Sequence, residues 1–153
     1  MNGKKIGIIA ILGILALCAV GYFIYDKKQN AVGLRVIPIS VSGVETDVVE
    51  RWVSTFQEVL KHDEVLQKIV NDSDYAAKLE IPDGEAVESL RNAVKVSHST
   101  SHRAITVGLS GKLKDSAILD TISRSVFDVV APIVAAKEPS FGAHLQSLQK
   151  AGQ

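Results

Sequence analysis

Ile6 to Tyr25 reads IGIIAILGILALCAVGYFIY, and this stretch decides how the rest of the chain is interpreted. Its twenty residues include no charged residue, no Asn or Gln, and no Pro. An α-helix rises 1.5 Å per residue, so a helix of this length would extend roughly 30 Å, the thickness of a bilayer's hydrocarbon core. The sequence therefore predicts a transmembrane helix over 6–25 and, after it, a domain tethered to a membrane or delivered across one.

A retained membrane anchor is the preferred interpretation of this stretch. The aromatic residues Tyr22, Phe23 and Tyr25 stand at its outer end, and aromatic rings favour the headgroup interface of a bilayer. Small residues recur along the span from Ile6 onward, and Gly13 is one that would permit close helix–helix packing. The predicted partner of this segment is the lipid bilayer itself.

Two alternatives to a retained anchor remain open. A cleaved signal peptide would use the small residues of Ala19-Val20-Gly21, although YFIY is then an unusual start for a mature chain. A lipoprotein signal would place the lipid on Cys18, although Leu17 is larger than the residue expected before it. Cys18 is the single cysteine of the chain, so the rest of the sequence contains neither a disulfide nor a thiol nucleophile.

The charges that flank the stretch bear on its orientation. Residues 1–5 carry two lysines and the α-amino group, and Lys27 and Lys28 follow the stretch on the other side. The positive-inside rule therefore gives only a slight preference, and a five-residue tail is easily retained in the cytoplasm. We expect 1–5 to be a short cytoplasmic tail, with a single pass through the cell inner membrane and an extracytoplasmic C-terminal domain.

The remainder of the chain is long enough for one domain with one core. Residues 45–90 carry twelve acidic and four basic residues, whereas residues 91–153 carry four acidic and eight basic residues. Opposite charge on the two halves would permit head-to-tail packing between copies, and it is equally typical of two solvated faces. The basic residues are too dispersed to predict nucleic-acid binding.

Periodicity places a helix-rich first half after a polar linker at 26–33. Residues 34–41 predict a strand, in which Pro38 cannot donate to a ladder and so indicates either one unpaired side or an irregular entry strand. Ser42 and Glu45 match a capping box. The helix behind it has the clearest amphipathic pattern of the chain, with Trp52 and Phe56 as core residues. Shorter helical segments follow up to residue 93.

The second half predicts two strands and a long helix. Apolar residues alternate over 94–97 and 105–109, around a polar connection at 97–103, and Asp115 would cap the helix that follows. The fold class is therefore α+β, with a ferredoxin-like sandwich over 34–136 in which helices cover one face of an antiparallel sheet. Residues 137–153 would form a tail or short helix, or would supply the last strand.

Candidate chemistry is sparse. His98 and His102 are four residues apart, a spacing that suits a metal on a helix, but they are predicted in a hairpin connection without a third ligand. The phosphate-binding loop and dinucleotide-binding glycine fingerprints do not occur. The sequence therefore predicts no enzyme, no cofactor and no catalytic residue. A small enzyme or metal site at these histidines is the alternative.

Short apolar motifs between residues 62 and 130 are similar to a known family. They are Val65-Leu66-Gln67-Lys68-Ile69-Val70, Leu90-Arg91-Asn92-Ala93-Val94-Lys95-Val96, Arg103-Ala104-Ile105-Thr106-Val107 and Lys114-Asp115-Ser116-Ala117-Ile118. In this order they resemble the extracytoplasmic domain of chain-length determinants, the Wzz-like polysaccharide co-polymerases. The sequence departs from that family in having no second apolar span and no long extended helix before one.

The resemblance implies ring-like self-association beside a polymerase, without catalysis. Together with the single span, this favours a non-enzymatic, membrane-anchored interaction or scaffold module on the extracytoplasmic side, in an envelope polysaccharide or secretion assembly. The alternative is an exported periplasmic binding protein, released by signal-peptide cleavage or lipidated at Cys18.

Overall fold

A computed structural model describes residues 22–151. The chain divides into two compact units, which we call unit 1 (Met1–Gly33 with Lys112–Lys114) and unit 2 (Leu34–Gly111 with Asp115–Gln153). Of the predicted span 6–25, only residues 22–25 lie within the described part. None of the helices in that part is both long and apolar enough to cross a membrane. The transmembrane helix thus remains a prediction.

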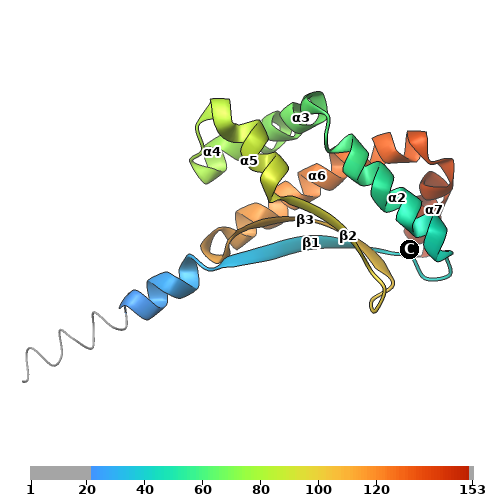
Figure 1. Ribbon diagram of the computed structural model, residues 1–153, viewed down its shortest axis with the longest axis horizontal. Coiled ribbons are helices and arrows are strands. Elements are labelled where there is room, and N and C mark those ends of the chain that lie inside the picture. The colour runs from blue at the N-terminus through green and yellow to red at the C-terminus, as the bar shows by residue number, and fades with distance from the viewer. Residues whose placement is uncertain (1–21, 152–153) are drawn as a thin grey trace, which may run out of the picture. The chain divides into compact units, whose positions relative to one another are not determined.

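The elements of residues 32–151 confirm an α+β fold with a three-stranded antiparallel sheet and helices (Figure 1). Two single 3-10 turns, Asp83–Glu85 and Leu113–Asp115, join longer elements. The strands and α-helices are β1 (Val32–Ser40), α2 (Thr46–Val59), α3 (Asp63–Ser73), α4 (Tyr75–Leu79), α5 (Ala86–Ala93), β2 (Val94–Ser99), β3 (Ala104–Lys112), α6 (Ser116–Lys137) and α7 (Pro139–Ala151).

The sheet has the strand order β1-β3-β2, so β3 is its central strand. β2 and β3 form an antiparallel hairpin in which Val94 pairs with Leu109 and Ser99 with Ala104. At the other edge of β3, the Val41 N–H donates to the Arg103 carbonyl at 2.8 Å, which sets the end of β1 beside the start of β3. β1 is therefore an edge strand, as Pro38 predicted. Because donors alternate along a strand, Pro38 occupies a position whose missing N–H would face the free edge.

Gly108 allows β1 to approach β3 closely. A Cβ atom added at Gly108 would lie 2.1 Å from the Arg35 carbonyl oxygen and 2.8 Å from Cγ1 of Val36. Real side chains do not approach a backbone oxygen so closely, so only glycine fits at this point of the central strand. The packing of the two strands thus depends on a residue whose side chain is a hydrogen atom.

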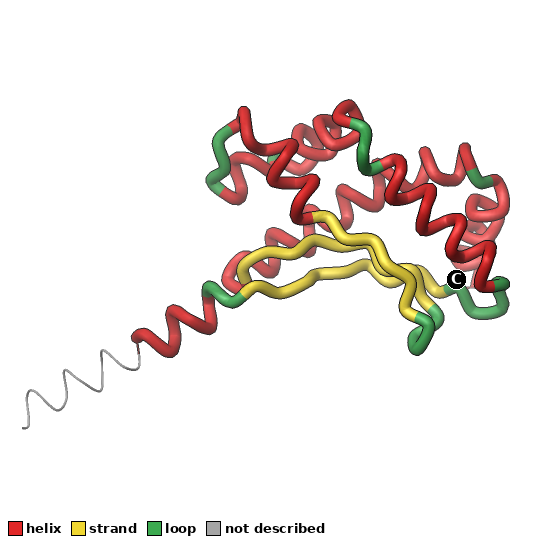
Figure 2. Tube along the Cα trace, viewed as in Figure 1, coloured by secondary structure: helices red, strands yellow, loops and turns green. Residues whose placement is uncertain are grey.

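The core lies between the sheet and the helices, which gather on one side of the sheet (Figure 2). Alternate residues of β3 point into it, because Ile105, Val107 and Leu109 are buried. α2 contributes the predicted apolar face, and Trp52 and Phe56 are confirmed as core residues. Burial of these side chains removes apolar surface from water and is the main stabilising contribution to the fold.

The C-terminal segment belongs to this core. Phe141 of α7 is buried, and its ring packs edge-on against Trp52 at 5.3 Å and against Phe56 at 5.2 Å between centroids. The indole N–H of Trp52 donates to Ser140 Oγ at 3.1 Å, so its polar atom is satisfied inside the contact. Of the predicted alternatives for 137–153, the structure therefore has the helix and not a fourth strand.

One predicted helix detail was wrong. The capping box at Ser42 and Glu45 is not formed, because α2 begins at Thr46 after an extended Glu45, and the cap makes no side-chain hydrogen bond. Gly43 has a positive φ of 81°, which bends the chain between β1 and the helix and moves Ser42 out of the capping position. In the long helix α6, Pro132 lies in the interior, and the helix continues through it to Lys137.

Candidate functional site

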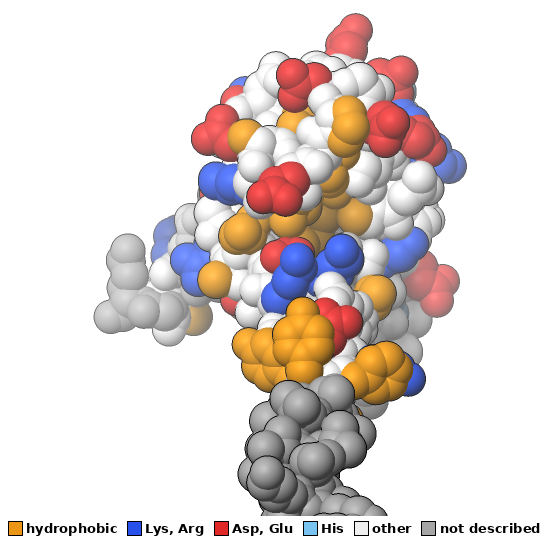
Figure 3. All heavy atoms as spheres, turned by 90° about the vertical axis from the view of Figure 1, so that its left-hand side faces the viewer, with side chains coloured by type: hydrophobic (Ala, Val, Ile, Leu, Met, Phe, Trp, Pro, Cys, Tyr) orange, Lys and Arg blue, Asp and Glu red, His pale blue; other side chains and the backbone are white. Residues whose placement is uncertain are grey.

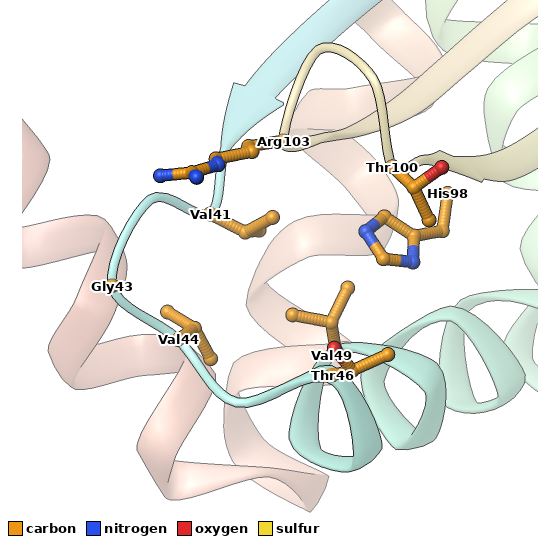
Figure 4. A pocket seen from close by; sticks show the side chains of 8 residues that line it. All are labelled: Val41, Gly43, Val44, Thr46, Val49, His98, Thr100 and Arg103. Atoms are coloured by element: carbon orange, nitrogen blue, oxygen red, sulfur yellow. The ribbon is translucent and has the colours of Figure 1, made fainter.

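One pocket of unit 2, of about 230 Å³, opens where the β2–β3 hairpin faces the start of α2 (Figure 4). Val41, Val44 and Val49 supply apolar walls, and His98 lies across from them. We call this the hairpin pocket. Its full lining is Val41, Gly43, Val44, Thr46, Val49, His98, Thr100 and Arg103.

His98 and His102 occupy different kinds of structure. His98 is in β2, paired with Ile105, and is half-buried at the pocket, whereas His102 is exposed in the turn after β2. The prediction that both lie in a hairpin connection was wrong for His98, because β2 extends to Ser99 and shortens the connection. Within residues 22–151, no three His, Cys, Asp or Glu residues are grouped so that they could hold a metal ion.

Arg103 has a strained backbone at the edge of the pocket. Its φ is 45°, a left-handed conformation that costs an L-residue roughly 1–2 kcal/mol. The Arg103 N–H donates to the Thr100 carbonyl, and its own carbonyl accepts from Val41, so the turn and β1 hold it in place. Its guanidinium extends away from His98 in Figure 4. The pocket thus presents one imidazole and two threonine hydroxyls beside valine side chains, which suits weak binding of a small group.

Among residues 22–151, two groups have shifted pKa values, and neither lines this pocket. A hydrogen bond and the positive charge of Lys137 lower the pKa of Glu58, whose carboxylate lies 2.9 Å from the Lys137 ammonium. Burial raises the pKa of Tyr75, although a hydrogen bond of its hydroxyl with Ser89 opposes the shift. Glu58 and Lys137 join α2 to α6 at the surface, and Tyr75 belongs to the core, so both shifts are explained by the packing of the fold.

The second candidate surface is the outer side of β1. Leu34 is 50% exposed and Val36 is 42% exposed, and Pro38 continues the same alternating face. No other strand of the described residues pairs with the outer edge of β1. We call Leu34, Val36 and Pro38 the edge stripe. Apolar side chains beside unpaired backbone groups are a template for pairing with another chain.

The anchor residues fall on both sides of the described boundary. Ile6 and Gly13 lie outside the described residues. Tyr22, Phe23 and Tyr25 lie in a helical segment at 22–29, and all three side chains are exposed. Three exposed aromatic side chains within about one helical turn are what the predicted interfacial position requires. That position itself stays a prediction.

His98 and the edge position of β1 could be predicted from the sequence, whereas the edge stripe and the role of Gly108 could not. The alternation of Leu34, Val36 and Pro38 with Arg35 and Ile37 is visible in the sequence, but it does not say which face the helices cover. Gly108 interrupts an apolar strand, and a glycine there is a signal of close backbone approach.

Comparisons of the chain with protein-family models, curated proteins and solved structures found no match.

Proposed function

We propose that this protein is a membrane-anchored, non-enzymatic interaction module that self-associates through the free edge of β1. The anchor is the apolar stretch 6–25, and the folded domain stands on the extracytoplasmic side of the inner membrane. The surroundings are an envelope polysaccharide or secretion assembly, as the resemblance to chain-length determinants implies.

The observation that carries this proposal is the edge stripe on a strand that pairs with β3 on one side only. Leu34 and Val36 are exposed although both are large and apolar, and β1 has no described neighbour on that side. Natural proteins usually protect such an edge with charged residues or a covering segment. Within the stripe, Pro38 provides the only such protection, at one end.

The order of helices and strands along the chain also supports self-association through β1. A ferredoxin-like fold has the element order β-α-β-β-α-β. In the described part of the chain the order is β1, α2–α5, β2, β3, α6, without the last strand, and α7 takes its place in the sequence. We interpret the fold as a reduced ferredoxin-like sandwich whose free β1 edge accepts the edge of a second copy. Pairing of two identical edges would be antiparallel and two-fold symmetric.

Disulfide trapping tests this proposal in the full chain. Cys18→Ser removes the native thiol, and single cysteines at 34, 36 and 38 are then oxidised in lipid bilayers. Two-fold pairing brings one position opposite itself, within the short Cα–Cα distance that a disulfide requires. We expect one strong dimer band among the three positions, and no band for a cysteine at the exposed Gly84.

Edge lysines supply the second arm of this test. Leu34→Lys with Val36→Lys should abolish the dimer, because lysines on an edge oppose strand pairing. Equal dimer formation in this variant, or equal trapping at 34, 36, 38 and 84, would contradict the edge proposal. Association that instead disappears at high salt would assign it to the acidic and basic halves of the chain.

The hairpin pocket favours the alternative, an exported binding protein. Its volume of about 230 Å³ and its valine walls fit a small apolar group, with His98 as a hydrogen-bonding partner. The intact mass of the mature protein distinguishes the two proposals. A chain that begins near Tyr22, or that carries lipid on Cys18, would replace the anchored module by this alternative.

A further inference from the structure

Unit 1 joins two segments that are about eighty residues apart in the sequence. The Leu113 N–H donates to the Ala31 carbonyl at 2.9 Å. A Cβ at Gly33 would lie 2.4 Å from Cδ2 of Leu113, so the leucine side chain packs directly on the glycine backbone. The turn 112–114 is therefore held against the segment that follows helical residues 22–29.

Lysine side chains surround this contact. Lys112 and Lys114 flank Leu113, and Lys27 and Lys28 lie in the helical segment, so unit 1 has four exposed lysines among its described residues. Asp26 is the single acidic residue among the described residues of unit 1, and its carboxylate accepts a hydrogen bond from the Asn30 amide at 2.8 Å. The Lys27 ammonium lies 4.9 Å from the centre of the Phe23 ring.

Apolar side chains accompany these lysines. Tyr22, Phe23, Ile24 and Tyr25 are all exposed, and Leu113 is 43% exposed. Figure 3 shows hydrophobic side chains and Lys or Arg side chains next to one another on the face that it displays. Exposed aromatic rings followed by lysines are the arrangement that suits the boundary between hydrocarbon and headgroups.

We propose that Lys27, Lys28, Lys112 and Lys114 form a basic collar that binds the phosphate groups of anionic phospholipids. The inference rests on the proposed anchoring through 6–25 and adds a second, sequence-distant membrane contact. From Phe23 to Lys28 a helix rises roughly 7.5 Å, about the depth of one headgroup layer, and a lysine stem adds several ångströms of reach. The collar thus stands at the height of the lipid phosphates when the aromatic rings occupy the interface.

Spin-labelled lipids test the collar in the full chain reconstituted into bilayers. The measurement compares how strongly labelled phosphatidylglycerol and phosphatidylcholine are immobilised by the protein. A lysine at an anionic surface contributes roughly a fivefold preference, which salt screens. We expect selectivity for phosphatidylglycerol at low salt, its loss in 0.5 M NaCl (about a 4 Å screening length), and a reduction of at least roughly fivefold in Lys112→Gln with Lys114→Gln.

The matched control is Lys95→Gln with Lys150→Gln, which removes the same charge from unit 2 and should leave the selectivity unchanged. Equal loss in the control pair would assign the effect to net charge and overturn the collar. The collar would also be overturned if Lys112→Gln with Lys114→Gln kept full selectivity for phosphatidylglycerol and only Lys27→Gln with Lys28→Gln lost it. If the wild-type chain immobilises neither lipid, the anchoring proposal fails as well, so the two failures are distinguishable.

Discussion

β1 and β3 are neighbouring strands of equal length, nine residues each, but their side chains have opposite environments. In β3 the three apolar residues Ile105, Val107 and Leu109 are buried under the helices. In β1 Leu34 and Val36 face outward and are exposed. Ile39, which points to the helix-covered face from the edge strand itself, is buried as well. The face of the sheet onto which a side chain points therefore decides which apolar side chains stabilise the fold and which remain available for a partner.

The same truncation in the two strands should give the largest contrast. Leu109→Ala removes a buried side chain and should lower the free energy of unfolding by about 3 kcal/mol, whereas Leu34→Ala should change it by less than about 0.5 kcal/mol. Urea unfolding of the full chain in detergent micelles, followed by the fluorescence of the buried Trp52, measures both. Comparable losses would show that the outer face of β1 is covered within a single chain.

The next largest loss of stability is expected at Gly108, where β1 and β3 approach closely. Gly108→Ala would place a methyl group against the Arg35 carbonyl and should destabilise the protein by about 2–3 kcal/mol. Gly84→Ala is the matched control, because a Cβ there meets nothing within 4 Å, and it should change stability by no more than about 0.5 kcal/mol. A tolerated Gly108→Ala would mean that β1 can move away from β3 without loss.

A substitution in the turn between β2 and β3 should have a smaller effect, and it should increase stability. Arg103→Gly relieves the positive φ and should raise the free energy of unfolding by about 1 kcal/mol, whereas Arg103→Ala keeps the strained backbone and should not. Thermal unfolding of the two variants in parallel separates backbone strain from charge. An equal gain in both would assign the effect to the guanidinium.

The surface pair of Glu58 and Lys137 should have the smallest effect, because it joins exposed side chains. The fold lowers the pKa of Glu58, so the stabilisation is complete at neutral pH and is lost as the pH falls through that lowered pKa. Glu58→Gln should flatten the acid limb of the stability–pH curve, and 1 M NaCl should reduce the difference from wild type. A steeper acid limb in the variant would give the opposite sign and refute the assignment.

Local pattern was enough for much of the fold. The amphipathic spacing of Trp52 and Phe56 and the alternation in residues 105–109 both depend on residues close in the chain, and each periodicity indicates an element and its buried face. Pro38 indicated an edge strand for a chemical reason, the missing N–H. The capping box failed because a positive φ at Gly43 depends on how the chain turns from β1 into α2.

For the candidate sites too, some features follow from the sequence alone and others only from the tertiary structure. The sequence by itself determined the apolar character of 6–25, the α+β class and the lack of a recognisable catalytic motif, because these follow from composition and short-range spacing. Only the tertiary structure placed His98 beside the valines of α2 and the β1–α2 connection, left Leu34 and Val36 exposed on an edge strand, and brought Leu113, between Lys112 and Lys114, to Ala31 and Gly33. Contacts between residues distant in the sequence arise from packing, and no periodicity along the chain specifies them.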